Sequence, residues 1–134
     1  CGIFGRKLET VMLRIGFTRP IVVSDYTSSD SMSEQTAGGL AEFKRNLGAR
    51  ISPRDITQLF TKAVEAPNIE NEHGVPFVVA YGCSDNTRRF WSLETARKYL
   101  DYQPEDDTEI TYAKEIAQLI TGAGSDVRGG KVGI

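Results

Sequence analysis

The sequence has few of the residues that mark several protein classes. It contains two cysteines, Cys1 and Cys83, and one histidine, His73. Two cysteines are too few for the disulfide framework of a small secreted domain. A single histidine argues against a zinc site built from Cys and His ligands, and we expect no metal. No stretch approaches the roughly 18–20 apolar residues of a membrane span, so we also expect no membrane insertion.

The charge balance excludes a dedicated nucleic-acid binder. The chain of 134 residues carries 16 Lys+Arg and 18 Asp+Glu, a formal net charge of −2. Nucleic-acid-binding proteins usually present a strongly basic face, which interspersed charges of both signs do not provide. With 40% hydrophobic and 25% charged residues, the composition is that of an ordinary globular domain.

Two short apolar runs predict strands. Residues 10–15 and 75–81 are almost continuously apolar and end at glycines. This pattern is typical of strands in a parallel sheet that is covered on both faces. Residues 20–23 form a weaker third candidate. The polar stretch over residues 24–39 predicts a mobile loop, and residues 122–134 predict a flexible glycine-rich tail.

The helix signals are clearest after Ser52. Ser52 is a suitable N-cap and Pro53 suits the first helical position. The apolar stripe expected on this helix consists of Ile56, Leu59, Phe60, Ala63 and Val64. We also predict helices after Ser92, over about residues 109–120 and, more weakly, over residues 40–46.

These elements predict a mixed α/β fold with two sheet strands and three to four helices, organised as one unit over residues 1–121. Two strands do not make a complete covered sheet, so we expect the rest of the sheet to lie outside this chain. The chain begins with Cys1 instead of Met, which favours a trimmed or processed piece of a longer protein.

Three blocks carry a resemblance to a known family. They are KLETVMLRIG (residues 7–16), ISPRDITQLFTKAVEAP (51–67) and FVVAYGCSDNTRRFWSLETARKYLDYQP (77–104). In this order they resemble the C-terminal third of an extended short-chain dehydrogenase/reductase, of the NAD-dependent epimerase/dehydratase type. The stretch from Ser84 to Trp91 is most similar to uronate dehydrogenase-like members. Asp101 stands where the family's last turn usually has glycine.

The resemblance implies a Rossmann-like fold whose N-terminal, nucleotide-binding half is missing here. The family binds NAD or NADP through a Gly-rich turn and uses a Tyr-x-x-x-Lys pair for proton transfer. The chain contains neither pattern. The segment from Leu119 to Gly124 is similar to a Gly-rich turn, but its glycine spacing departs from the fingerprint, which favours a tail segment.

The resemblance also implies site residues. Arg45 stands where uronate dehydrogenase-like members carry an arginine that binds the carboxylate of the sugar acid, a task that suits a planar guanidinium. The alternative is a solvated residue at the end of a helix. Gly16, Phe17 and Thr18 follow the carboxyl end of the first strand, where open α/β sheets bind ligands. We expect Phe17 and Thr18 to border substrate and Gly16 to border the cofactor.

Several other residues have a functional and a structural interpretation. Arg14 is expected to be a structural arginine in a buried strand. Ser84, Asp85 and Asn86 follow the second strand and suit either ligand binding or turn formation. The cluster from Arg88 to Trp91 suits a nucleobase or acidic-sugar contact, although packing of the indole under a helix is favoured.

The remaining polar candidates favour structural roles. Capping accounts for Ser52 and Asp55, His73 lies on a polar loop, and Cys83 suits an inert core position. The acidic run from Asp101 to Glu109 is expected to be a solvated turn and not a metal site.

The function predicted by resemblance is the substrate-binding part of an NAD(P)-dependent sugar oxidoreductase or epimerase. We expect it to be cytoplasmic, inactive by itself, and partnered by a sugar or sugar acid and by the remainder of a parent enzyme, with a homo-oligomer possible. The alternatives are a non-catalytic binding or scaffolding module derived from the same fold and a sugar-sensing domain.

Overall fold

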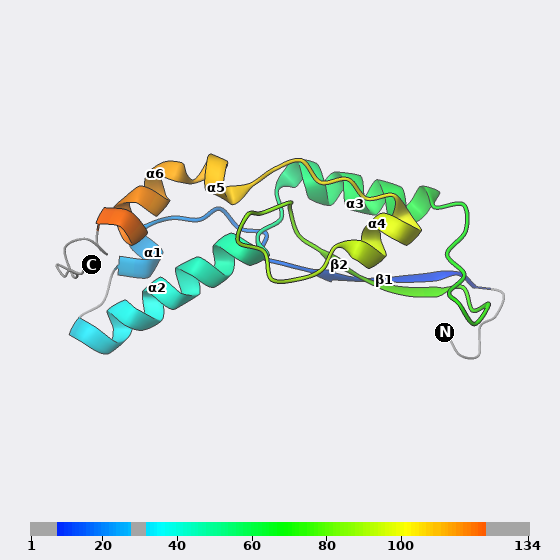
Figure 1. Cartoon of the computed structure of the whole chain (residues 1–134), viewed down its shortest axis with the longest axis horizontal. Helices are drawn as coiled ribbons and strands as arrows, with labels where there is room; N and C mark the ends of the chain where they lie inside the picture. The colour runs from blue at the N-terminus through cyan, green and yellow to red at the C-terminus, as the bar shows by residue number, and fades with distance from the viewer. Residues whose placement is uncertain (1–7, 28–31, 123–134) are drawn as a thin grey trace.

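The computed structural model describes residues 8–27 and 32–122. Within them, an elongated α/β arrangement places two strands at one end and most of the helices at the other (Figure 1). The strands are β1 (Thr10–Ile15) and β2 (Phe77–Gly82). They pair in parallel, with Thr10 opposite Phe77 and Ile15 opposite Gly82. The α/β fold class and both main strands are therefore confirmed.

Two helices cover one face of this sheet. They are α3 (Pro53–Glu65) and α4 (Glu94–Leu100) (Figure 1). The core between the sheet and these helices, here called the sheet-side core, contains Ile51, Leu59, Ile69, Val78, Ala80, Cys83, Leu93, Ala96, Leu100 and Tyr102. Ser52 caps α3 as expected, because its Oγ accepts a hydrogen bond from the Asp55 N–H at 3.1 Å.

The other face of the sheet is open over most of its length, and Trp91 covers its carboxyl end by stacking on Tyr81. Met12 of β1 and Val79 of β2 lie opposite each other and are 49% and 39% exposed. Arg14 is also exposed, and its guanidinium donates to the Tyr81 hydroxyl at 3.1 Å. The expectation that Arg14 is buried is therefore wrong, because its strand is covered on one face only.

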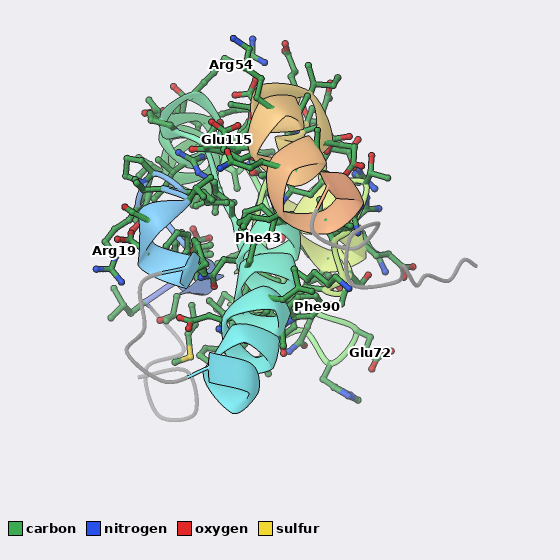
Figure 2. All side chains as sticks on the ribbon, turned by 90° about the vertical axis from the view of Figure 1, so that its left-hand side faces the viewer. Arg19, Phe43, Arg54, Glu72, Phe90 and Glu115 are labelled. Atoms are coloured by element: carbon green, nitrogen blue, oxygen red, sulfur yellow. The ribbon has the colours of Figure 1, made fainter. Side chains whose placement is uncertain are left out.

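A second core forms at the helical end. The helices there are α1 (Ser24–Thr27), α2 (Met32–Ala49), α5 (Thr108–Thr111) and α6 (Ala113–Ile116), followed by the π-helix η1 (Ala117–Gly122). Phe43 lies among these helices (Figure 2). This helix-side core contains Ile21, Phe43, Leu47, Ile116 and Leu119.

The loop predicted for residues 24–39 is wrong over its described part. Helix α1 occupies Ser24–Thr27, and α2 begins at Met32, well before the predicted helix over residues 40–46. A glycine is required inside α2 because a Cβ on Gly39 would lie 2.5 Å from the Tyr26 carbonyl oxygen. The glycine therefore marks close packing of α1 on α2. Residues 28–31 of the predicted loop lie outside the described residues.

Three other predictions about elements need correction. Residues 20–23 form no strand: Ile21 is buried in the helix-side core, and the chain turns into α1 through the Asp25 N–H, which donates to the Val22 carbonyl at 3.1 Å.

Phe60 and Val64 of α3 are 51% and 85% exposed, because the helix turns Asp55 and Leu59 inward instead.

The predicted helix over residues 109–120 is divided at Tyr112, and Ile110 is 80% exposed. Of the predicted tail, Gly122 ends η1, and residues 123–134 lie outside the described residues, as does Cys1. Within the described ranges, no helix has the length and apolar character needed to cross a membrane.

Candidate functional site

The chain changes partner at the carboxyl end of β1. The Gly16 N–H still donates to the Gly82 carbonyl at 2.9 Å. The Phe17 N–H then donates to the Ala49 carbonyl, and the Phe17 carbonyl accepts from the Ile51 N–H, both at 2.9 Å. Because α2 ends at Ala49 and α3 begins at Pro53, this switch fixes the connection between the two helices beside the end of the strand.

A hollow of about 400 Å³ opens beside this switch. We call it the α1–α2 hollow, and its lining residues are Phe17, Arg19, Pro20, Val22, Asp25, Tyr26, Glu42 and Asn46. The Asn46 side-chain amide, which is buried, donates to the Tyr26 hydroxyl at 2.9 Å. The Arg19 guanidinium lies 5.5 Å from the centre of the Phe17 ring and projects away from the ribbon (Figure 2). The hollow therefore combines an aromatic wall, a fixed amide, one cation and the two carboxylates of Asp25 and Glu42.

The residues predicted to bind substrate or cofactor lie at different distances from this hollow. Phe17 lines it, whereas Thr18 is exposed and follows it in the chain. Gly16 packs tightly: a Cβ there would lie 1.8 Å from the Ala49 carbonyl oxygen and 3.1 Å from the Trp91 ring. Arg45 is exposed on α2, next to the lining residue Asn46 but outside the lining itself. The binding roles of Arg45, Thr18, Phe17 and Gly16 stay predictions.

Sequence reasoning missed Arg50. It is 8% exposed, and its guanidinium lies 5.3 Å from the centre of the Tyr112 ring. Its Nη1 donates to the Ile51 carbonyl at 3.3 Å, while its Nε has no hydrogen-bond partner within the described part of the chain. No sequence signal distinguishes Arg50 from the exposed arginines around it, because its burial comes from the docking of Tyr112 over the α2–α3 connection.

The polar residues after β2 organise the backbone. Ser84 Oγ accepts a hydrogen bond from the Ser52 N–H at 2.9 Å. The Asn86 amide donates to the carbonyls of Gly48 and Arg50 at 3.1 and 2.8 Å, and its Oδ1 accepts from the Thr108 N–H at 3.1 Å. Of the two interpretations left open for these two residues, the contacts support the structural one.

A second and larger hollow, of about 950 Å³, lies at the start of α4. We call it the α4 hollow, and its lining residues are Thr87, Arg89, Phe90, Trp91, Ser92, Leu93, Glu94, Arg97 and Lys98. Trp91 stacks on Tyr81, with ring centres 5.1 Å apart, and Phe90 meets Trp91 edge-on at 5.4 Å. The indole is therefore packed, but on Tyr81 of β2 and not under a helix as favoured from the sequence, and it also borders the hollow. Arg88 and Arg89 pair with Glu109 and Asp85.

The other polar candidates are held in structural contacts. Asp55 is fully buried, and its two carboxylate oxygens accept from the Glu105 and Asp106 N–H groups at 3.0 and 3.1 Å. Asp55 thus fixes the turn before α5, a role beyond capping. His73 is exposed beside Glu72. No group of three or more His, Cys, Asp or Glu within residues 8–27 and 32–122 is arranged to hold a metal ion.

Cys83 has the character of an inert core thiol. It is fully buried, and burial raises its pKa from 9.0 to about 11. Desolvation also raises the pKa of Tyr102, whose hydroxyl donates to the Cys83 carbonyl at 2.9 Å. Because the thiolate is the nucleophilic form, a thiol with so high a pKa is a poor nucleophile near neutral pH.

Alkaline pH should destabilise the fold through these two groups. In the unfolded chain the thiol and the phenol ionise near their ordinary pKa values, whereas in the folded chain they stay protonated. These two groups should therefore leave the free energy of unfolding unchanged at neutral pH and lower it as the pH rises through 9 toward 11. The thiol alone accounts for at most about 1.4 kcal/mol per pH unit. Urea unfolding at several pH values measures this fall in the free energy of unfolding. In Cys83→Ala the free energy of unfolding should depend less steeply on pH. An equal dependence in both proteins would show that the Cys83 thiol does not contribute.

Comparison with known proteins supports a likeness to NAD-dependent dehydrogenases. The chain is 35% identical over 111 residues to uronate dehydrogenase of Pseudomonas syringae pv. tomato, which covers 83% of this chain and 31% of that protein. It is 33% identical over 75 residues to NAD-dependent glucose-6-phosphate dehydrogenase of Haloferax volcanii, which covers 55% of this chain and 26% of that protein. The matches thus span only about a quarter to a third of the length of these relatives. No family model and no solved structure matches the chain.

Proposed function

We propose that this chain is the substrate-side part of an NAD(P)-dependent sugar dehydrogenase or epimerase of the extended short-chain dehydrogenase type, and that the α1–α2 hollow takes the sugar. The position of this hollow carries the proposal, because ligands of open α/β sheets bind beyond the carboxyl ends of the strands. Phe17 lies at that end of β1 and lines the hollow. The two relatives, whose names refer to a uronate and to a sugar phosphate, support a sugar-type substrate.

The chemistry of the lining suits an acidic sugar. Arg19 can form two parallel hydrogen bonds to a carboxylate or phosphate, and the Phe17 ring offers an apolar wall for a sugar face. Asp25 and Glu42, which also line the hollow, can accept hydrogen bonds from sugar hydroxyls. Thr18 borders the hollow in this proposal, and Arg45 supplies a second cation from α2.

Hydride and proton transfer are assigned to no residue of this chain. The sequence contains neither a Gly-rich turn between a strand and a helix nor a Tyr-x-x-x-Lys pair, and in this proposal NAD or NADP is bound mainly by residues of the parent enzyme outside this chain. Ala49 and Trp91 fill the space beside Gly16, which leaves Gly16 at most a position bordering the cofactor.

The open face of the sheet supports a larger parent enzyme. Parallel strands are almost always covered on both faces, yet Met12 and Val79 are exposed here. We propose that the remainder of the parent enzyme covers this face and continues the sheet. In its absence the chain should self-associate in size-exclusion chromatography at increasing concentration. A cytoplasmic location belongs to the same proposal and rests on the likeness alone.

The binding proposal predicts a specific loss of affinity. Titration of the chain with a hexuronate, followed by NMR chemical shifts, should give saturable shifts around the α1–α2 hollow, and the corresponding neutral hexose should bind less tightly. Arg19→Gln should raise the dissociation constant roughly tenfold, because a hydrogen bond between charged groups is lost. Arg45→Gln tests the second cation in the same way.

Arg54→Gln is the matched control. Arg54 is exposed on α3 and pairs with Glu105 and Asp106, so its loss should leave binding unchanged. An equal effect of all three substitutions, or the absence of saturable shifts, would contradict the site. Reduction of NAD by the chain with any sugar would contradict its expected inactivity.

A further inference from the structure

The α4 hollow collects positive charge beside aromatic rings. Three cations, Arg89, Arg97 and Lys98, line it together with one carboxylate, Glu94. Arg97 and Lys98 come from α4, and Arg89 comes from the loop before that helix. The neighbouring Arg88 does not line the hollow, and its guanidinium forms two hydrogen bonds to the Glu109 carboxylate at 2.8 and 3.3 Å. The folded chain therefore brings together cations from two separate segments, and it leaves out Arg88, the sequence neighbour of Arg89.

Asp85 holds two of these cations in place without using all their donors. Its Oδ1 accepts from Arg89 Nη1 at 2.7 Å and from Arg97 Nη2 at 3.3 Å. A guanidinium has five N–H donors, so each arginine keeps several for a ligand. Lys98 packs its ammonium 5.2 Å from the centre of the Tyr99 ring and pairs with no carboxylate of the described residues. The cations are therefore positioned and only partly neutralised.

The aromatic residues add a surface for a planar ring. Phe90 lines the hollow, meets Trp91 edge-on and packs against Gly48 of α2, and its side chain is still 56% exposed. Trp91 is held in turn by stacking on Tyr81. Stacking of a nucleobase on an aromatic side chain is strongly favourable and tolerates any base. A volume of about 950 Å³ leaves room for a ring and a charged group together.

We propose that the α4 hollow binds a nucleoside monophosphate, with the phosphate held by Arg89, Arg97 and Lys98 and the base stacked on Phe90. The phosphate accepts hydrogen bonds from the guanidinium and ammonium groups, which are its preferred partners. This site is separate from the α1–α2 hollow, because the two hollows share no lining residue, and Arg19 and Phe90 lie to either side of α2 in the view of Figure 2. It does not depend on the proposed sugar site, and either proposal can fail alone.

The single tryptophan of the chain makes the test direct. Trp91 is the single tryptophan and lines the hollow, so intrinsic fluorescence reports on this site. Because its ring also lies beside Gly16 and Tyr81, the substitutions described below assign the response to the hollow. Titration of the chain with adenosine monophosphate should change the emission saturably. Ribose 5-phosphate, which lacks the base, and adenosine, which lacks the phosphate, should each bind roughly tenfold more weakly. Inorganic phosphate measures the contribution of charge alone.

Two substitutions separate charge from stacking. Lys98→Gln should raise the dissociation constant of adenosine monophosphate roughly tenfold, as expected for the loss of a charged hydrogen bond. Phe90→Leu should raise the dissociation constant of adenosine monophosphate by a similar factor and leave the dissociation constant of ribose 5-phosphate unchanged. Both side chains are exposed, and circular dichroism should show an unchanged fold.

Lys114→Gln is the control for net charge, because Lys114 is an exposed lysine on α6 outside the hollow. It should bind adenosine monophosphate as the unmodified chain does. Equal weakening by Lys114→Gln and Lys98→Gln would reduce the effect to general electrostatics and overturn the site. Equal affinity for adenosine monophosphate and ribose 5-phosphate would overturn the role of Phe90. An unchanged emission, together with an unshifted indole N–H signal in NMR spectra, would overturn the proposal altogether.

Discussion

Replacing Asn86 by aspartate should lower the free energy of unfolding by about 3–5 kcal/mol. The Asn86 side chain is fully buried and donates to two carbonyls, those of Gly48 and Arg50. An aspartate of the same shape cannot donate when ionised, and it would place a negative charge against both carbonyl oxygens. The loss should become smaller at acidic pH, because a protonated carboxyl group regains one donor. Urea unfolding at two pH values measures both effects.

Asn68→Asp is the matched control for this change. Asn68 is exposed, and its Oδ1 accepts a hydrogen bond from the Glu70 N–H at 2.9 Å. Aspartate keeps that acceptor, so the free energy of unfolding should change by less than about 0.5 kcal/mol. Similar losses in the two variants would show that Asn86 does not hold the connections after α2 and before α5 in the way that its hydrogen bonds indicate.

Gly16→Ala should be nearly as destabilising, by about 2–4 kcal/mol. The added Cβ would lie 1.8 Å from the Ala49 carbonyl oxygen. That oxygen accepts the Phe17 N–H, so the backbone can move away only by weakening the switch at the end of β1. The destabilisation should appear as a lower urea midpoint. NMR shifts should change at Phe17 and in the α2–α3 connection.

Gly74→Ala separates this steric effect from backbone strain. Gly74 has a φ of 71°, and no atom lies within 4 Å of a Cβ placed on it. Alanine there should cost only the roughly 1 kcal/mol of a left-handed conformation. If Gly16→Ala were no more harmful than Gly74→Ala, the close approach of Ala49 to Gly16 would be disproved.

The parts of the fold that local patterns specify could be predicted. Both main strands carry continuous apolar runs, and α3 has its cap at Ser52 and a proline at its first position. The segment before Leu40 could not be predicted, because its small polar residues favour a loop in isolation. Its helices depend on tertiary packing, such as the contact of Gly39 with the backbone of Tyr26.

The candidate sites show the same division. The position after a strand directed attention to Phe17, which lines the α1–α2 hollow, and its contact with substrate stays a prediction. The resemblance singled out Arg45, which is exposed, whereas no sequence signal indicated Arg50, which is buried under Tyr112. The sequence analysis grouped only the residues from Arg88 to Trp91. Arg97 and Lys98 of α4 also line the hollow, and they come close to Trp91 only because the chain turns into that helix.

The parallel pairing of β1 with β2 also has a kinetic consequence. Thr10 lies opposite Phe77, so the two strands meet only after a closure that spans 67 residues. Closing so long a segment costs conformational entropy before the hydrogen bonds between β1 and β2 can stabilise the chain. Proteins with such long-range pairings fold slowly. Helix α3, whose contacts with its cap are local, is expected to form first. The sheet that presents Gly16 and Phe17 would then be among the last elements to assemble, so both hollows would mature late in folding.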